Sequence, residues 1–144
     1  MDFSEVPVIV CGVDIKSKQA FLALVQKFDD DVSHLPCDTK KLRLADDRDA
    51  DSLVIMKASI EAFALQNKIS AFIIKSRQAT GVCASGGITF KIETLFQLSS
   101  TPVIFISPLA LSKFAKSNLG GSPLSVLSYQ TDAYGVGACY VSKV

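Results

Sequence analysis

Residues 8–25 constrain the fold most, because they indicate two apolar strands joined by a short polar turn. Val8 to Ile15 is almost wholly apolar, which is typical of a strand covered on both faces of a sheet. The turn is Lys-Ser-Lys-Gln at 16–19, and Ala20 to Val25 returns as a second apolar strand. Asp14 is the one carboxylate in the first strand. Because a buried charge costs several kcal/mol unless it is paired, we expect Asp14 to have a partner or a function.

The composition predicts a single folded domain over residues 1–144. Hydrophobic residues make up 49% of the chain, which excludes extensive disorder. The formal net charge is +1, so any binding to nucleic acid must come from a local basic patch. The acidic start, Met-Asp-Phe-Ser-Glu, is unlike a secretory signal, and no uninterrupted apolar run is long enough to cross a membrane. Cys11 and Cys139 lie in apolar segments and are expected to be reduced core residues of a cytoplasmic protein with no membrane partner.

The rest of the chain predicts alternating strands and helices. Phe28 to Thr39 carries three consecutive aspartates and Pro36, which favours an exposed connection. The expected elements after it are an edge strand Lys40–Leu44, a helix from Asp49 or Asp51 to Gln66, a strand Ser70–Lys75, a loop Ser76–Ile88, a helix Thr89–Ser99, a strand Pro102–Ser107, a helix Pro108–Ser117 and a last helix Ser125–Val141.

This order predicts an α/β fold with a mixed five-stranded sheet. Three leading strands joined by short connections are antiparallel, and the two later strands arrive through helical crossovers and are parallel. Right-handed crossovers place helices on both faces of the sheet.

The same order is used by the ribonuclease H-like superfamily, and particular residues strengthen the resemblance. Gly12-Val13-Asp14 resembles the first strand of that superfamily, which carries an aspartate. Asp132-Ala133, followed by Ala138, resembles the terminal helix of the Holliday-junction resolvase (RuvC-like) branch. Residues 10–14, 44–49 and 86–91 together are similar to a small bacterial family of uncharacterised proteins assigned to this fold.

The resemblance implies a nuclease dependent on Mg²⁺ or Mn²⁺ that acts on nucleic acid. Such enzymes hold one or two cations between at least three carboxylates, which clamp a displacement at phosphorus. Asp14 and Asp132 match two of those positions and would be catalytic metal ligands. The third does not match, because the fourth strand ends in Lys75-Ser76-Arg77 where a glutamate is expected. Glu93 on the next helix is the remaining candidate for a third catalytic carboxylate.

The alternative is a non-catalytic binding module of the same fold. Lys75 and Arg77 lie on one side of the strand end, where they can pair with Asp14 or bind a phosphorylated ligand or a protein partner. Gly86 and Gly87 precede a helix whose free amides can cradle an anion. Two further lysines, Lys91 and Lys16, would extend that binding site.

Each of these residues also has a purely structural explanation. Asp14 can be a paired core carboxylate, Asp132 a satisfied polar contact, the glycine pair a turn and the lysines solvated cations. A third function, a sugar-kinase-like phosphotransferase, needs two copies of the fold and hence a dimer. A homodimer would use the edge strand Lys40–Leu44 or the apolar helix surface Leu109–Phe114.

Overall fold

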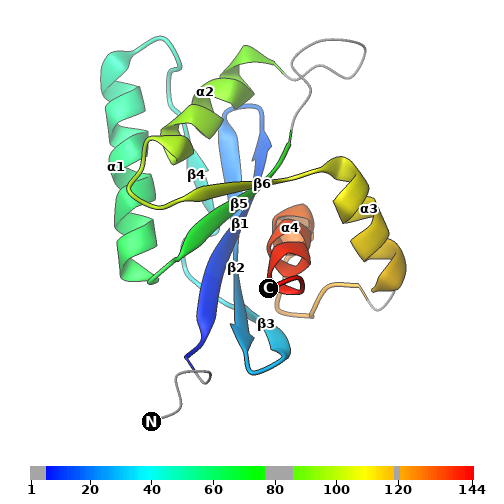
Figure 1. The fold of residues 1–144 in the computed structure, drawn as a ribbon. Helices are drawn as coiled ribbons and strands as arrows, with labels where there is room; N and C mark the ends of the chain where they lie inside the picture. Colours follow the sequence, from blue (N-terminus) through cyan, green and yellow to red (C-terminus); the bar gives the residue numbers. More distant parts are fainter. Residues whose placement is uncertain (1–5, 77–85, 119–120) are drawn as a thin grey trace.

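The computed structural model describes residues 6–76, 86–118 and 121–144, and their strands form one mixed sheet between two layers of helices (Figure 1). The predicted α/β class with a mixed sheet and helices on both faces is therefore confirmed. In chain order the elements are β1 Val8–Lys16, β2 Gln19–Phe28, β3 Asp31–Leu35, β4 Lys41–Arg43, α1 Ala50–Gln66, β5 Ala71–Lys75, α2 Gly87–Gln97, β6 Val103–Ile106, α3 Pro108–Ser117, the 3₁₀ turn η2 Ser128–Gln130 and α4 Thr131–Val141.

Within the described residues, six strands occupy five positions in the sheet, in the order β3-β2-β1-β5-β6. β4 also pairs with β2, so β3 and β4 follow one another along the same edge. The pairs β1–β2, β2–β3 and β2–β4 are antiparallel, and β1–β5 and β5–β6 are parallel. The carboxyl ends of β1, β5 and β6 consequently meet at one edge of the sheet, as predicted from the crossovers.

The prediction of an exposed connection from Phe28 to Thr39 is wrong, because this segment contains a sixth strand, β3. Asp29 adopts a positive φ of 52°, and residues 29–30 form a two-residue turn between Phe28 and Asp31. Aspartate tolerates this left-handed conformation better than most residues. The polar run is therefore a hairpin turn, and Val32 behind it packs into the core.

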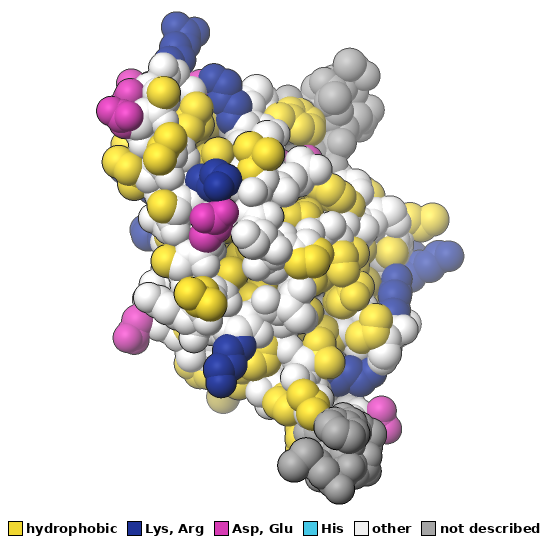
Figure 2. Space-filling model, turned by 60° about the vertical axis from the view of Figure 1, so that its left-hand side comes forward, with side chains coloured by type: hydrophobic (Ala, Val, Ile, Leu, Met, Phe, Trp, Pro, Cys, Tyr) yellow, Lys and Arg dark blue, Asp and Glu magenta, His cyan; other side chains and the backbone are white. Residues whose placement is uncertain are grey.

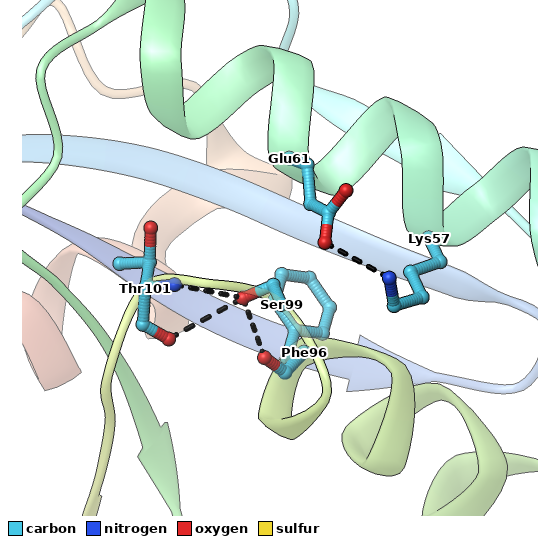
Figure 3. Close-up of polar contacts among 5 residues, drawn as sticks. All are labelled: Lys57, Glu61, Phe96, Ser99 and Thr101. Atoms are coloured by element: carbon cyan, nitrogen blue, oxygen red, sulfur yellow. Dashed lines mark hydrogen bonds and ion pairs between the residues drawn. The ribbon is translucent and has the colours of Figure 1, made fainter.

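Helices α1, α2 and α3 follow the prediction closely, with shifts of up to two residues at their ends. Asp49 caps α1 by accepting the Asp51 amide, and Ser107 caps α3 by accepting the Ala110 amide. The hydroxyl of Ser99 ends α2 early, because it donates to the Phe96 carbonyl at 2.7 Å and accepts the Thr101 amide at 3.4 Å (Figure 3).

The last helix begins later than predicted, at Thr131 instead of Ser125. Gln130 explains the difference. Its side chain is 3% exposed, accepts the Leu127 amide at 3.1 Å and donates to the Leu22 carbonyl at 2.9 Å. These bonds hold η2 against β2 as a separate turn, so α4 starts only after it.

Two apolar layers cover the sheet, one on each face. α1 and α2 pack on one face against Cys11, Val13 and Ile15 of β1, and α4 packs on the other against Val10 (Figure 1). The outer surface of α1 is also apolar: Val54 and Ile55 are each 65% exposed, and the side of the molecule that carries α1 comes forward in Figure 2. Among the described residues, no helix is long and apolar enough to span a membrane.

Candidate functional site

Asp14 lies near the carboxyl end of β1 and faces α4. Side chains alternate along a strand, and Cys11, Val13 and Ile15 belong to the core beneath α1 and α2. Asp14 and Lys16 therefore point to the opposite face, toward α4. The carboxylate of Asp14 is only 13% exposed, and the Lys16 ammonium lies 3.3 Å from its Oδ2 atom.

Asp132, in the first turn of α4, reaches the same ammonium. Its Oδ2 atom is 3.6 Å from Lys16 Nζ, and its side chain is 69% exposed. The structure thus brings Asp14 and Asp132 together as predicted, but joins them through a cation. We call Asp14, Lys16 and Asp132 the bridged acid pair.

Close packing of α4 on β1 makes this meeting possible. A Cβ atom added to Gly12 would lie 1.7 Å from the carbonyl oxygen of Ala133, which is far below van der Waals contact. A Cβ atom added to Gly137 would lie 2.8 Å from a methyl group of Val25. Glycine at these two positions lets the helix backbone approach the strand, and so brings Asp132 over the end of β1.

The electrostatics of the bridged acid pair are reflected in the pKa of Lys16, which is raised above its ordinary value. The charge of Asp14 and the hydrogen bond to it are the largest causes, and Asp132 adds a smaller contribution. Desolvation of the ammonium acts in the opposite direction. Lys16 therefore stays charged throughout the neutral range and neutralises part of the acidic charge around it.

A pocket of about 370 Å³ opens beside the bridged acid pair, between α3 and α4. Its lining includes the charged residues Asp14, Asp132 and Lys75 and the aromatic residues Phe114 and Tyr134. Lys75 is exposed, and among the described residues no acid lies within ion-pairing distance of it. Lys75 therefore lines the same pocket as Asp14, in line with the prediction that it lies near this acid. The predicted ion pair between them is not formed, whereas Lys16 does pair with Asp14.

The donor set does not fit a metal centre of the kind that the resemblance implies. In residues 6–76, 86–118 and 121–144, no three Asp, Glu, His or Cys side chains are grouped so as to hold a metal ion. Asp14 and Asp132 share an ammonium group where an Mg²⁺ or Mn²⁺ ion would need their charge.

The other predicted site residues lie elsewhere. Glu93 is half-buried on α2, which covers the opposite face of the sheet from α4. Lys91, also on α2, is bound to the Asp47 carboxylate at 3.1 Å, and this interaction lowers the pKa of Asp47. Gly86 caps α2 and Gly87 begins it, and neither lines the pocket. Arg77 lies outside the described residues.

The sequence predicts Lys75 or Arg77 as the partner of Asp14, and within the described residues it is Lys16, expected chiefly as a turn residue, that forms an ion pair with it. The predicted contact with Arg77 lies outside those residues. The signal that identifies Lys16 is its spacing. It follows Asp14 by two residues on one strand, so both side chains must share a face. The sequence alone does not show where the strand ends. In the structure β1 continues through Lys16, and the turn begins at Ser17, whose φ is 54°.

Solved structures of Holliday-junction resolvases share this fold. Thermus thermophilus RuvC matches with a TM-score of 0.69 at 10% identity, and the match covers 94% of each chain. T. thermophilus RuvC in complex with Holliday junction substrate matches with a TM-score of 0.63 at 13% identity, over 94% of this chain and 93% of that one. Fowlpox virus resolvase in complex with Holliday junction DNA matches with a TM-score of 0.54 at 14% identity, over 94% of this chain and 98% of that one. At these identities the likeness shows the fold alone.

No curated protein matches the chain in sequence. A family model does match it, over residues 8–140, and its description is "protein of unknown function (DUF3010)". The matched segment begins at the first residue of β1 and ends one residue before the end of α4, so it contains the whole sheet and the bridged acid pair. The chain therefore belongs to the DUF3010 family.

Proposed function

We propose that the chain binds branched or otherwise structured nucleic acid at the carboxyl edge of its sheet, and that it binds without cleaving. The fold supports the choice of ligand, since structures of RuvC and of the fowlpox resolvase with Holliday junctions share it. The absence of cleavage follows from the chemistry of the bridged acid pair.

The observation that carries the proposal is the position of Lys16 Nζ, 3.3 Å from Asp14 and 3.6 Å from Asp132. Two bare carboxylates would repel a phosphate group and would need metal ions to bring one near. With Lys16 between them and Lys75 beside them, two positive groups balance two negative ones among the described residues of this edge. Phosphates can then approach without a metal, and the negative charge that would hold a metal ion is already partly neutralised by Lys16.

A second candidate is the divalent-metal-dependent nuclease implied by the resemblance, and the exposure of Lys16 favours it. The side chain of Lys16 is 59% exposed on a flexible stem, so it can leave the two carboxylates. Mg²⁺ is commonly bound by one or two carboxylates together with substrate phosphates. The two candidates differ in a single measurable property, which is whether a bound junction is cut.

Fluorescence anisotropy with a labelled four-way DNA junction tests the proposal, first in EDTA and then in Mg²⁺ or Mn²⁺. We expect the same affinity in all three buffers, and an intact junction on a denaturing gel after prolonged incubation. The Lys75→Glu variant should bind more weakly. Lys68→Glu should not, because it makes the same charge change in the turn before β5, at the opposite edge of the sheet.

Two results would overturn the proposal. Failure of the wild-type chain to bind any branched, duplex or single-stranded nucleic acid removes the proposed ligand. Metal-dependent cutting that disappears in both Asp14→Asn and Asp132→Asn establishes the nuclease instead.

A further inference from the structure

A strip of basic and aromatic side chains crosses β1, β2 and β4 beside the bridged acid pair. Directly paired residues of antiparallel strands share a face of the sheet. Lys16 is paired with Gln19, and Gln19 with Arg43. In the neighbouring row Phe21 is paired with Asp14 on one side and with Lys41 on the other.

Both rows lie on the face that α4 covers. Leu42 of β4 packs against the core beneath α1 and α2, so Lys41 and Arg43 point the other way. Ala20 and Leu22 of β2 belong to that same core, which places Gln19 and Phe21 with the cations. Adjacent strands are about 4.8 Å apart, so the strip extends roughly 10 Å from β1 to β4.

The cations of β4 are available for a ligand. Lys41 and Arg43 are exposed, and neither has an acidic partner within ion-pairing distance in the part of the chain that the structure describes. Two exposed cations two residues apart on an edge strand discourage strand-to-strand aggregation. That structural role does not require aromatic rings beside them.

An aromatic pair lies next to these cations. The ring of Tyr129, from η2, lies 5.5 Å from the ring of Phe21, with an angle of 51° between their planes. Tyr129 is 40% exposed, and η2 is fixed by the bonds of Gln130 to Leu127 and to Leu22. The strip therefore offers a partly exposed ring on a fixed support, with cations beside it.

We propose that this strip, Lys16, Phe21, Lys41, Arg43 and Tyr129, binds a single strand of nucleic acid leading to or from the bridged acid pair. Cations that follow a phosphate backbone and a ring on which a base stacks are the two components of sequence-tolerant single-strand binding. A duplex buries its base faces and cannot use the ring, and an acidic peptide needs only the charges. The inference rests on the proposed function, since it specifies which form of nucleic acid meets that edge.

The test measures anisotropy of a labelled oligothymidylate and of a matched duplex against four variants. Tyr129→Ala should weaken single-strand binding about tenfold and leave duplex binding nearly unchanged, because base stacking is removed. Tyr129→Phe should bind like wild type. Arg43→Glu should weaken binding of both ligands. It should also reduce the salt dependence of single-strand binding: the slope of log affinity against log salt concentration should fall by about 0.7 for each phosphate that the variant no longer neutralises. Lys68→Glu is the control with equal charge change.

A second measurement does not depend on affinity. The chain contains no tryptophan, so Tyr129→Trp creates a single fluorophore. Stacking predicts quenching of its emission as oligothymidylate is added, whereas Leu65→Trp on α1, a position 82% exposed, should show none.

The outcomes separate the two proposals. If wild type binds the junction but Tyr129→Ala and Arg43→Glu bind oligothymidylate as wild type does, the strip is wrong and the proposed function stands. If wild type binds no nucleic acid, both fall. If polyglutamate competes with oligothymidylate equally well in wild type and in Tyr129→Ala, the strip is an acidic-peptide site and the nucleic-acid assignment is overturned.

Discussion

The two faces of the sheet are built by opposite means. Beneath α1 and α2 the core uses large side chains, such as the rings of Phe72 and Phe96, whose centroids are 4.9 Å apart. Beneath α4 the packing depends on small residues, since Gly12 and Gly137 allow helix and strand backbones to meet. The first face supplies buried apolar area, and the second fixes where Asp132 lies. Stability and site geometry should therefore respond to different substitutions.

The largest expected effect on stability is on the first face. Phe72→Ala removes a fully buried ring and should lower the free energy of unfolding by about 3–5 kcal/mol, measured by urea denaturation. Because the ring lies on the opposite face of the sheet from α4, the raised pKa of Lys16 should persist in the folded variant. Loss of that raised pKa would show that the two faces are not independent.

Gly12→Ala should cost less stability but should disrupt the site. The added methyl group collides with the Ala133 carbonyl, so α4 must move, at about 3 kcal/mol. We expect the pKa of Lys16 to fall slightly as Asp132 is displaced, because only the smaller contribution of Asp132 is lost while Asp14 stays beside Lys16 on β1. Gly135→Ala is the matched control on α4, because its Cβ would meet nothing within 4 Å. A Gly12→Ala variant as stable as wild type, with an unchanged Lys16 pKa, would contradict the role of close packing.

Gln130→Ala should have a moderate effect. It leaves the Leu127 amide and the Leu22 carbonyl without their side-chain partner, at about 1–3 kcal/mol. Faster hydrogen exchange should appear in η2 and at the start of α4, but not in α1. Gln66→Ala, exposed at the end of α1, is the control with the same change of side chain. Equal hydrogen-exchange rates in η2 and α4 of the two variants would argue against Gln130 as the residue that fixes η2.

The sequence predicted the elements whose apolar pattern is strong and local, and it missed features set by distant contacts. α1, α3 and the parallel strands follow from spacing and from the caps Asp49 and Ser107. β3 was missed because charge along Asp29 to Asp31 concealed a turn, and the start of α4 because Gln130 is held by β2, more than 100 residues away in the chain.

In the candidate site too, the sequence predicted some features and missed others. That Asp14 and Asp132 meet could be predicted, because their strand and helix follow from the order of elements. The bridge through Lys16 could not, because it depends on the exact residue at which β1 turns. The placement of Lys91 on Asp47 could not be predicted either, because it joins α2 to the turn before α1.

The smallest expected effect is electrostatic and separates the two acids. Asp14→Asn should lower the pKa of Lys16 toward its ordinary value of 10.5 more than Asp132→Asn does, because Asp14 is the larger cause of the shift. Carbon-13 NMR of the Lys16 ε carbon measures this directly. A raised pKa means that, while both carboxylates are ionised, the Lys16 ammonium contributes its full stabilisation below pH 10.5 and loses it as the pH rises through the folded-state value. An equal or larger shift in Asp132→Asn would reverse the assigned order of the two acids.

The most direct test of the central claim, that an ammonium group occupies the place between Asp14 and Asp132, is a Mn²⁺ titration followed by carboxylate NMR. Paramagnetic broadening reports which acids hold the ion, and Asp51, an exposed acid in the first turn of α1, is the internal reference. We predict that Asp14 and Asp132 broaden no more than Asp51. Selective broadening of both at Mn²⁺ concentrations that leave Asp51 sharp would contradict the account.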